Sequence, residues 1–397
     1  MKKIVSIPDF ESRLKRKIRK HFKSIGYTIK DHVLIPPTLS KENIRLLHKK
    51  QKEEIIDSKE SFFRRIKQNT FDYFASGNEI NPEKIKPRLE LVEPSSPSAD
   101  LFLLASLTWS VPVSIGYGRR LRFLVWDDYN NKLMGIIALK DPGIHLKVRE
   151  DHIGWDNKTK NNQLIHVMDS YIVGSIPPYN QLLCGKLISC LLKSLEIKDF
   201  FNNKYKNSVG IISQKNKKPR LSLITTTSAL GRSSIYNRLT INKEKFMLPV
   251  SYTDGWGHFH FSREILDDFD ELLLRKKDDY YKSYKFKQGA NYKIRKIRKA
   301  IQYLNMPISL LQHQIKREFF VTPIANNYKE FLNKNAKRPD YSSLRTAEEI
   351  GFMARDRWII KRAEKDKSYK KWKKSSIKKL IFTEDHILDL PLFESIK

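Results

Sequence analysis

The stretch LSLITTTSALGRSSIYNRL, from Leu221 to Leu239, decides the fold class predicted for this chain. Its first part, Leu221 to Thr227, is apolar and β-branched, which is typical of a buried strand. A small polar loop follows, and Ile235 to Leu239 has the pattern of the first turns of a helix. Ser233 or Ser234 is the expected N-cap of that helix. The stretch therefore predicts a strand, a glycine-bearing loop and a helix in direct succession.

The loop in this stretch is a candidate anion site. A helix that begins after a glycine-bearing loop presents free backbone N–H groups, and an arginine beside it adds a bidentate donor. The alternative is an ordinary capped helix with an arginine that faces solvent. The candidate residues here are Gly231, Arg232, Ser233, Ser234, Tyr236 and Arg238.

A second candidate anion site lies in YIVGSIPPYNQLLCGKL, from Tyr171 to Leu187. A strand ends at the paired prolines, and a helix is expected to begin at Asn180, because leucines then recur every four residues. The alternative is an ordinary amphipathic helix with a capping asparagine. The candidate residues are Tyr179, Asn180, Gly185 and Lys186, and we expect this site to face the one at Arg232.

The remaining strand signals complete an α+β core with a mixed sheet. LRFLVWDD (Leu121 to Asp128) and KLMGIIAL (Lys132 to Leu139) are joined by a turn so short that only an antiparallel hairpin fits. HVMDSYIVGSI (His166 to Ile176) predicts a third strand, and VGIIS and RLSLITTT predict further ones. This order is similar to the core of GNAT acyltransferases. Leu183 stands where their phosphate loop has a glycine, so the likeness concerns the fold and implies no cofactor.

Five motifs in this order resemble the DruA family, whose members belong to the Druantia antiphage system. Besides the two stretches above they are WSVPVSIGYGRRLRFLVWDD (Trp109 to Asp128), REDHIGWD (Arg149 to Asp156) and YTDGWGHFHF (Tyr252 to Phe261). The resemblance covers Leu91 to Ser262 well and extends loosely through IPP (Ile35 to Pro37) and FASGNEINPEKIKPRL (Phe74 to Leu89). It implies a bacterial defence component that works with other proteins, including a large helicase-like partner, and it implies no particular reaction.

The charge of the chain points to a polyanionic partner. The formal net charge of +32 is far from neutral, which favours nucleic acid, with DNA as the expected form. An anionic membrane surface is the competing partner, but no segment has the ~20 apolar residues that span a bilayer. The N-terminus lacks the apolar segment of a signal peptide, and the two cysteines, Cys184 and Cys190, are not spaced for a disulfide within one helix. We therefore expect a cytoplasmic protein.

Composition divides the chain into four regions. Residues 1–77 are basic and helical, 78–100 form a proline- and serine-bearing linker, 101–262 form the DruA-like core, and 263–397 are again basic and helical. From Arg275 to Lys379 there are 30 Lys and Arg against 10 Asp and Glu. The densest nucleic-acid-binding candidates are Lys293, Arg295, Lys296, Arg298, Lys299, Lys370, Lys371, Lys373 and Lys374.

Aromatic residues lie between these clusters and are candidates for stacking on bases. They are Tyr280, Tyr281, Tyr284, Phe286, Tyr369 and Trp372. The alternative is a solvated helical face whose aromatic side chains pack inward. No zinc-finger or RNP sequence is present, so no base-reading function is predicted.

Two further sets of residues are of the types that bind metal ions. His258 and His260 alternate in GHFHF and would point to one face of a strand, yet such pairs are usually surface residues. The carboxylates that magnesium would need are scattered over hairpin, loop and strand: Asp127, Asp128, Glu150, Asp151, Asp156 and Asp169. No metal site and no cofactor is predicted.

Two functions of different class remain open. The first is a binding component of a defence complex, in which basic helices hold DNA and the core contacts partner proteins. The second is a nucleic-acid-modifying enzyme, acyltransferase-like or a metal nuclease, with its site in the α+β core. Convergence of Tyr179, Asn180, Lys186, Arg232, Tyr236 and Arg238 on one cleft would favour the enzyme, whereas dispersal would favour the binding component.

Overall fold

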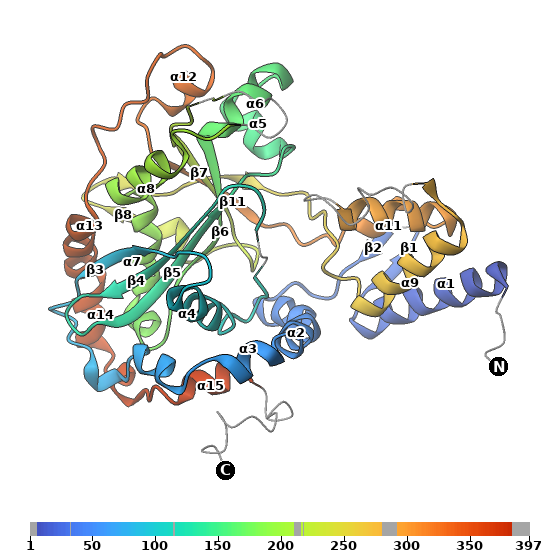
Figure 1. The fold of residues 1–397 in the computed structure, drawn as a ribbon, viewed down its shortest axis with the longest axis horizontal. Coiled ribbons are helices and arrows are strands. Elements are labelled where there is room, and N and C mark those ends of the chain that lie inside the picture. The colour runs from blue at the N-terminus through green and yellow to red at the C-terminus, as the bar shows by residue number, and fades with distance from the viewer. Residues whose placement is uncertain are drawn as a thin grey trace. The chain divides into compact units, whose positions relative to one another are not determined.

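The computed structural model describes residues 6–31, 33–113, 116–209, 216, 218–279 and 292–382. They form two compact units, each assembled from segments that are separate in the sequence (Figure 1). The helical unit comprises Met1–Glu54, Ala229–Gly231 and Tyr252–Arg317, and the sheet unit comprises Ile55–Ser228, Arg232–Ser251 and Glu318–Lys397. The four regions expected from composition divide the chain differently and stay a prediction.

The sheet unit is built on a seven-stranded mixed sheet with the order β10-β11-β7-β6-β5-β4-β3 (Figure 1). β6 and β7 run parallel, whereas the pairs β3–β4, β4–β5, β5–β6 and β7–β11 are antiparallel. The predicted hairpin, third strand and mixed α+β sheet are thereby confirmed. The strands are β3 (Pro87–Leu91), β4 (Arg120–Asp127), β5 (Lys132–Lys140), β6 (Val167–Ser175), β7 (Leu223–Thr227), β10 (Leu248–Tyr252) and β11 (Glu318–Pro323).

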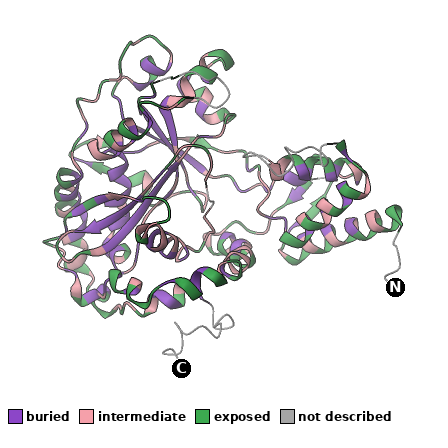
Figure 2. Ribbon diagram, viewed as in Figure 1, coloured by how far each residue is buried: buried purple, intermediate pink, exposed green. Residues whose placement is uncertain are grey.

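Helices cover both faces of this sheet. One face presents Phe123, Leu139 and Met168 to an apolar cluster with side chains of α7, α8 and α13. On the other face, Leu124 and Ile136 pack in a cluster with α3, α4 and α15. The strands β4, β5, β7 and β11 are accordingly buried along most of their length (Figure 2). These helices are α3 (Glu60–Arg65), α4 (Pro97–Ser106), α7 (Cys184–Cys190), α8 (Leu195–Tyr205), α13 (Ala347–Ala354) and α15 (Ser376–Ile381).

Shorter elements join the parts of the sheet unit. Before the sheet come η1 (Gln68–Tyr73) and η2 (Gly77–Glu79), and between β5 and β6 come α5 (Lys147–Ile153), α6 (Asn157–Gln163) and η3 (Leu164–His166). Further along are η4 (Tyr179–Leu182), η5 (Leu191–Lys193), η6 (Tyr236–Arg238), β8 (Thr240–Ile241), β9 (Glu244–Lys245) and α12 (Tyr328–Leu332). The C-terminal part adds the π-helix η8 (Arg355–Ile359), α14 (Ile360–Lys365) and η9 (Ser368–Lys371).

The helical unit packs helices around its own apolar core. Leu14, Ile18 and Phe22 are buried on one stripe of α1, against Phe269 of α9 and Ile297 of α11. Ser40 caps α2, because its hydroxyl accepts a hydrogen bond from the Asn43 amide. The elements are α1 (Ile7–Ser24), β1 (Thr28–Lys30), β2 (Val33–Ile35), α2 (Lys41–Asp57, whose last residues belong to the sheet unit), α9 (Arg263–Arg275), α11 (Tyr292–Tyr303) and η7 (Ile308–Leu311).

The structure corrects three local predictions. The helix expected over Ile235–Leu239 is the single 3-10 turn η6, because the chain enters β8 at Thr240. His258 and His260 lie in a bend and turn instead of a strand, and the His260 ring is buried in the core of the helical unit. The C-terminal region is not helical throughout, since β11 lies between β7 and β10 in the sheet. The VGIIS strand falls largely outside the described residues.

Neither cysteine forms a disulfide. Cys184 and Cys190 are free and buried at the two ends of α7, as their spacing predicts. Among the described residues, no helix combines the length and the apolar character that crossing a bilayer requires.

Candidate functional site

The two loops predicted to bind anions meet in the sheet unit. Leu183 adopts a left-handed conformation with φ 61°, and this turn starts α7 beside η6. A Cβ placed on Gly185 would lie 3.6 Å from Ile235 Cδ1, and the Tyr236 hydroxyl oxygen lies 3.5 Å from the Val173 carbonyl oxygen. Tyr236 thus fills the space between the two segments. The structure therefore brings the start of α7 and the segment around η6 together, as the order of the elements predicts.

A cluster of positive charge surrounds this junction. The Lys186 ammonium lies 4.9 Å from the centre of the Trp358 ring, which belongs to η8. Burial lowers the pKa of Lys186, and the neighbouring Arg238 and Arg357 guanidinium groups lower it further. Within the described part of the chain, no ion pair joins any of these three cations to a carboxylate. We call Lys186, Arg238 and Arg357 the Lys186 cluster.

The Gly231 loop is already occupied by a carboxylate of the protein. Glu318, at the start of β11, accepts hydrogen bonds from the Ser233 amide (2.8 Å) and from Asn237 Nδ2 (2.7 Å). The Ser233 hydroxyl accepts one from the Tyr236 amide (3.0 Å). The amide that was expected to be free for a ligand is therefore satisfied internally. The side chains of Arg232 and Ser234 are exposed beside it.

Tyr179 is buried, and its hydroxyl belongs to a polar network with residues of the β4–β5 hairpin. Its hydroxyl donates to Asp127 Oδ2 (3.0 Å) and accepts from Asn130 Nδ2 (3.0 Å). Asn130 Nδ2 also lies within hydrogen-bonding distance of the Glu79 carbonyl (2.9 Å). Burial raises the pKa of both Tyr179 and Asp127, so the tyrosine stays protonated as the donor. Asn180, the next residue, is exposed.

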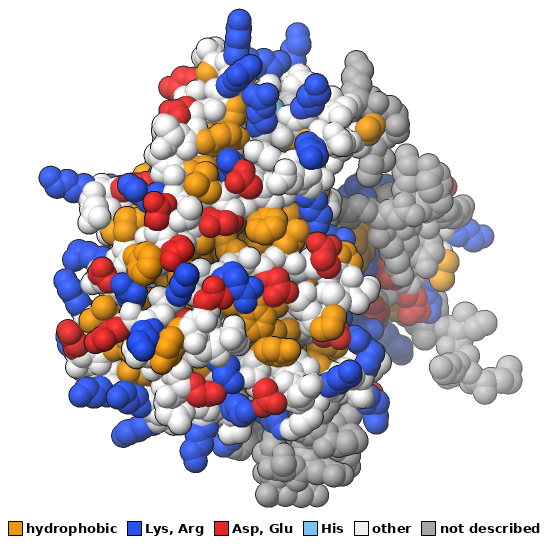
Figure 3. Space-filling view, turned by 60° about the vertical axis from the view of Figure 1, so that its left-hand side comes forward, with side chains coloured by type: hydrophobic (Ala, Val, Ile, Leu, Met, Phe, Trp, Pro, Cys, Tyr) orange, Lys and Arg blue, Asp and Glu red, His pale blue; other side chains and the backbone are white. Residues whose placement is uncertain are grey.

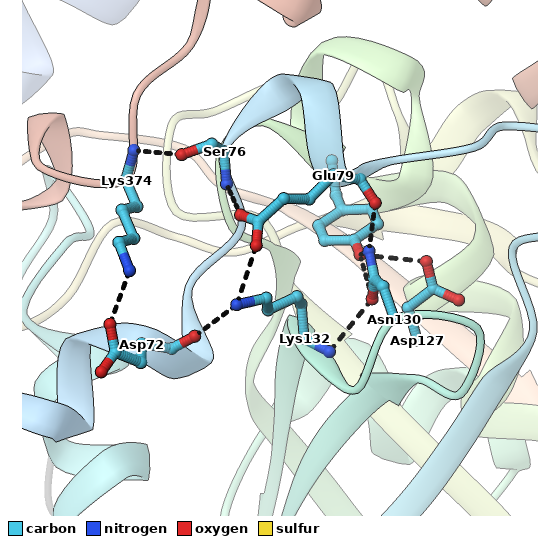
Figure 4. Close-up of polar contacts among 8 residues, drawn as sticks. Asp72, Ser76, Glu79, Asp127, Asn130, Lys132 and Lys374 are labelled. Atoms are coloured by element: carbon cyan, nitrogen blue, oxygen red, sulfur yellow. Dashed lines mark hydrogen bonds and ion pairs between the residues drawn. The ribbon is translucent and has the colours of Figure 1, made fainter.

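The same network reaches the C-terminal segment. Lys132 pairs with Glu79 (3.0 Å) and donates to the Asp72 carbonyl (2.7 Å), while Lys374 pairs with the Asp72 carboxylate (2.5 Å) (Figure 4). Burial opposes ionisation of Glu79, but the Ser76 amide and Lys132 hold its pKa below the usual range. The contacts tie η1, η2 and the β4–β5 turn to the chain after η9. This network is structural, and it engages Lys374, one of the predicted nucleic-acid ligands.

The predicted basic patch on α11 is partly engaged within the helical unit. Lys296 is buried, pairs with Asp270 (3.0 Å) and donates to the Leu266 carbonyl (2.8 Å). Lys299 pairs with Asp278 at 3.6 Å. The side chains of Arg295 and Arg298 are exposed on the same helix, and Lys293 is half-buried. Of the five predicted residues, Lys296 is therefore the least accessible to a ligand.

The second basic cluster lies along η9 and the residues after it. Lys370, Lys371 and Lys373 are exposed, in contrast to the paired Lys374. Tyr369 is only 3% exposed and packs in the core, so it is not available to stack on a base. Trp372 also packs against an apolar cluster. Tyr280, Tyr281, Tyr284 and Phe286 lie outside the described residues.

A charged strip on the sheet was not predicted as a unit. Lys140 pairs with Asp169 across β5 and β6, and Asp169 with Thr225 across β6 and β7. Cross-strand partners point to the same face, so these side chains lie together between two apolar clusters. The Lys140 ammonium is 3.7 Å from Asp169 Oδ2, and the Thr225 hydroxyl donates to Asp169 Oδ1 (3.0 Å).

A buried arginine adds to this strip. Arg149 of α5 is fully buried, and its guanidinium donates to the Gly143 carbonyl (2.8 Å), while its Nε has no hydrogen-bond partner among the residues that the structure describes. Burial raises the pKa of Asp169, and Lys140 and Arg149 oppose that shift. Burial and the nearby Asp169 charge raise the pKa of Tyr117 to about 12. Polar residues within otherwise apolar strands were the sequence signal for this strip.

The carboxylates considered for magnesium do not gather. Within the described part of the chain, no three His, Cys, Asp or Glu side chains are grouped as metal ligands. Asp128 pairs with Arg88, Glu150 with Arg149 and Lys160, and Asp156 caps α6. Each is explained by its protein partners.

The ten loop candidates thus do not converge on one cleft. Tyr179 is buried in a network, Ser233 is closed by Glu318, and Tyr236 fills the junction. Among the candidate residues, the cations Lys186, Arg232 and Arg238 remain at least partly accessible to solvent.

Comparison with known proteins identifies the family. The family model described as Druantia protein DruA matches residues 38–334, which include all five motifs and continue beyond Ser262, whereas IPP (Ile35 to Pro37) lies just outside the match. The chain is 43% identical to Druantia protein DruA of Escherichia coli (strain UMEA 4076-1) over 371 residues, which is 93% of this chain and 92% of the relative. No solved structure matches it. The chain belongs to the DruA family of Druantia proteins.

Proposed function

We propose that this chain is the nucleic-acid-binding component of a Druantia antiphage defence system, with DNA as the expected ligand. Membership of the DruA family supports the defence role. The Lys186 cluster is the observation that carries the binding role. Three cations that have no carboxylate partner among the described residues repel one another, and a phosphate backbone would relieve that repulsion.

The distribution of charge supports the same proposal. The net charge of +32 leaves many Lys and Arg without an acidic neighbour. On the face of the sheet unit drawn in Figure 3, Lys and Arg side chains stand around the margin and crowd the upper end. Asp and Glu side chains are scattered over the middle of that face, and some also lie at its left edge and near its upper end (Figure 3). A polyanion that approaches this face would therefore meet mostly positive side chains at its margin.

The proposal includes partner proteins and a location. Family membership supports assembly with other proteins of the same defence system, including a helicase-like partner. We place the complex in the cytoplasm, where its nucleic-acid ligand is found. The proposed GNAT-like character of the core is supported by its order of elements, in which a hairpin, a third strand, a crossover helix and a parallel strand follow one another.

Fluorescence anisotropy with labelled 20-nucleotide single-stranded and 20-base-pair duplex DNA tests the binding role. In the variant Lys186→Gln/Arg238→Gln/Arg357→Gln, we expect affinity at 0.1 M salt to fall about ten-fold. The slope of log K against log salt should fall by roughly three, because each lost phosphate contact removes about 0.9.

The matched control replaces three exposed lysines elsewhere in the sheet unit, Lys158→Gln/Lys243→Gln/Lys329→Gln. It removes the same charge and should change the affinity by less than the cluster variant does. Equal losses in the two variants would mean that only total charge matters. No binding by the unaltered chain would contradict the function itself.

The charged strip around Asp169 supports a second candidate, a nucleic-acid-modifying enzyme. A lysine, a carboxylate and a threonine hydroxyl in contact on one sheet face are groups that can move protons. Against an acyltransferase-like site, Leu183 lies at the turn and Glu318 holds the Ser233 amide. The binding function therefore ranks first.

A further inference from the structure

A groove at the end of α8 is lined by four cations and by no carboxylate. Its volume is about 700 Å³, and its positive residues are Lys206, Lys218, Arg220 and Arg338. All four are exposed, and the structure gives none of them an ion pair within the described residues. We call it the Arg220 groove. It shares no residue with the Lys186 cluster or with the basic clusters expected from the sequence.

The walls of the Arg220 groove are fixed by hydrogen bonds from buried parts of the sheet unit. The Arg220 amide donates to His166 Nδ1 (2.9 Å), and the Tyr341 hydroxyl donates to the Leu221 carbonyl (3.0 Å). Asn202 Oδ1 accepts from the Leu221 amide (3.4 Å). The cations are therefore mounted on a backbone that is ordered before any ligand arrives, which lowers the entropic cost of binding.

Two carboxylates close in the sequence to lining residues, Asp199 and Asp340, do not themselves line the groove. Asp199 pairs with Lys198 (2.6 Å), and Asp340 accepts hydrogen bonds from the Ser342 amide (2.9 Å) and Asn326 Nδ2 (3.0 Å). The C-terminal end of α8 contributes a partial negative charge of about one half, which opposes an anion. Four full positive charges outweigh it. The net field in the groove therefore favours an anion.

We infer that the Arg220 groove is a second nucleic-acid surface, which holds the phosphate backbone of a strand. The inference rests on the proposed nucleic-acid function. In it, a nucleic-acid strand contacts the end of α8 and the segment before β7. Several cations along an open groove suit consecutive phosphates, whereas a single phosphate needs fewer. Asn202 lies among them as a neutral polar side chain that can bond to phosphate or sugar oxygens.

The test combines a charge variant with a direct probe of location. Binding of the same single-stranded and duplex DNA is measured for Lys206→Gln/Lys218→Gln/Arg220→Gln/Arg338→Gln across a salt series. Affinity should fall at least ten-fold and the salt slope by roughly three to four. The control Lys243→Gln/Lys245→Gln/Lys365→Gln/Lys367→Gln removes four exposed charges outside the groove and should have a smaller effect.

Lysine acetylation followed by mass spectrometry locates the contact without any variant. DNA should protect Lys206 and Lys218 from the reagent and leave Lys243 unprotected. The inference would be overturned if the unaltered chain binds DNA, the groove variant binds it with the same affinity, and DNA does not protect these lysines. The proposed function would then still stand. Protection by ATP but not by DNA would assign the groove to a free phosphate ligand. Absence of DNA binding by the unaltered chain would overturn both proposals.

Discussion

At the scale of single residues, Tyr179 separates a structural role from a ligand-binding role. Its buried hydroxyl satisfies both Asp127 and Asn130. In Tyr179→Phe these two buried groups each lose one hydrogen-bond partner, so we expect the free energy of unfolding to fall by about 1–3 kcal/mol. DNA affinity should not change, because the side chain does not reach the surface. Urea unfolding together with the anisotropy assay checks both expectations.

Tyr73→Phe is the matched control for that prediction. Tyr73 is 47% exposed and its ring packs edge-on against Trp126. Loss of this hydroxyl should leave stability within about 0.5 kcal/mol, as for most exposed substitutions. A Tyr179→Phe variant with full stability and weakened DNA binding would return Tyr179 to the ligand site.

The same residues show what sequence can predict of a site. Lys186 and Arg238 follow two neighbouring strands, so their proximity could be expected from the order of elements. Arg357 could not, because it comes from a distant helix whose packing has no sequence signal. Tyr179 was misplaced for the same reason: its partner Asp127 lies 52 residues away, and nothing local marks the pair.

At the scale of elements, close contact between two short helices pins the C-terminal segment to the sheet unit. A Cβ placed on Gly77 of η2 would lie 1.8 Å from the Tyr369 carbonyl oxygen of η9. Backbone cannot yield as a side chain does, so Gly77→Ala should force η9 away. We expect the free energy of unfolding to fall by about 3 kcal/mol or more, at the upper end of overpacking effects. Thermal unfolding of Gly77→Ala, compared with the unaltered chain, measures this change.

Gly143→Ala serves as the control, since the nearest atoms to its added Cβ are 3.8 Å away or further. It should be close to neutral. If Gly77→Ala is equally neutral, η2 and η9 do not pack closely in solution. The contact itself could not be read from the sequence, because it joins segments almost 300 residues apart.

At the scale of the whole molecule, local patterns predicted the centre of the sheet but not its edges. The hairpin β4–β5 and the unit β6–α7–β7 follow from apolar runs and short turns. β3 and β11 did not stand out, since PRLEL lies within a proline-bearing segment and EFFVTP within a basic one. Both strands are defined by the neighbours that they pair with, and such long-range pairing carries no local signal.

The two units differ in how they should respond to acid. The helical unit holds five histidines whose pKa values are lowered, chiefly by burial: His21, His48, His258, His260 and His313. The pKa is about 4 for His48, His258 and His260 and about 3 for His313. The charged groups that act on them are mostly cations, namely Lys50, Lys293, Lys296 and Arg317, with Glu264 acting on His21. The sheet unit has lowered pKa values at His152 and His166.

The sign of the effect follows from these shifts. A histidine with a lowered pKa in the fold stabilises it fully above the unfolded pKa of about 6.5, and this stability is lost as pH falls toward 4. At pH 5 the loss is about 2 kcal/mol for each histidine whose folded pKa is near 4. Hydrogen exchange at pH 7.5 and 5.0, corrected for intrinsic rates, should show α1 and α9 losing protection before β4–β6. His260→Gln, which cannot ionise, should narrow the difference between the two pH values. The buried histidines would be excluded as the cause if both units lost protection from exchange equally at pH 5.0. The same conclusion would follow if the difference in protection between the two pH values were unchanged in His260→Gln.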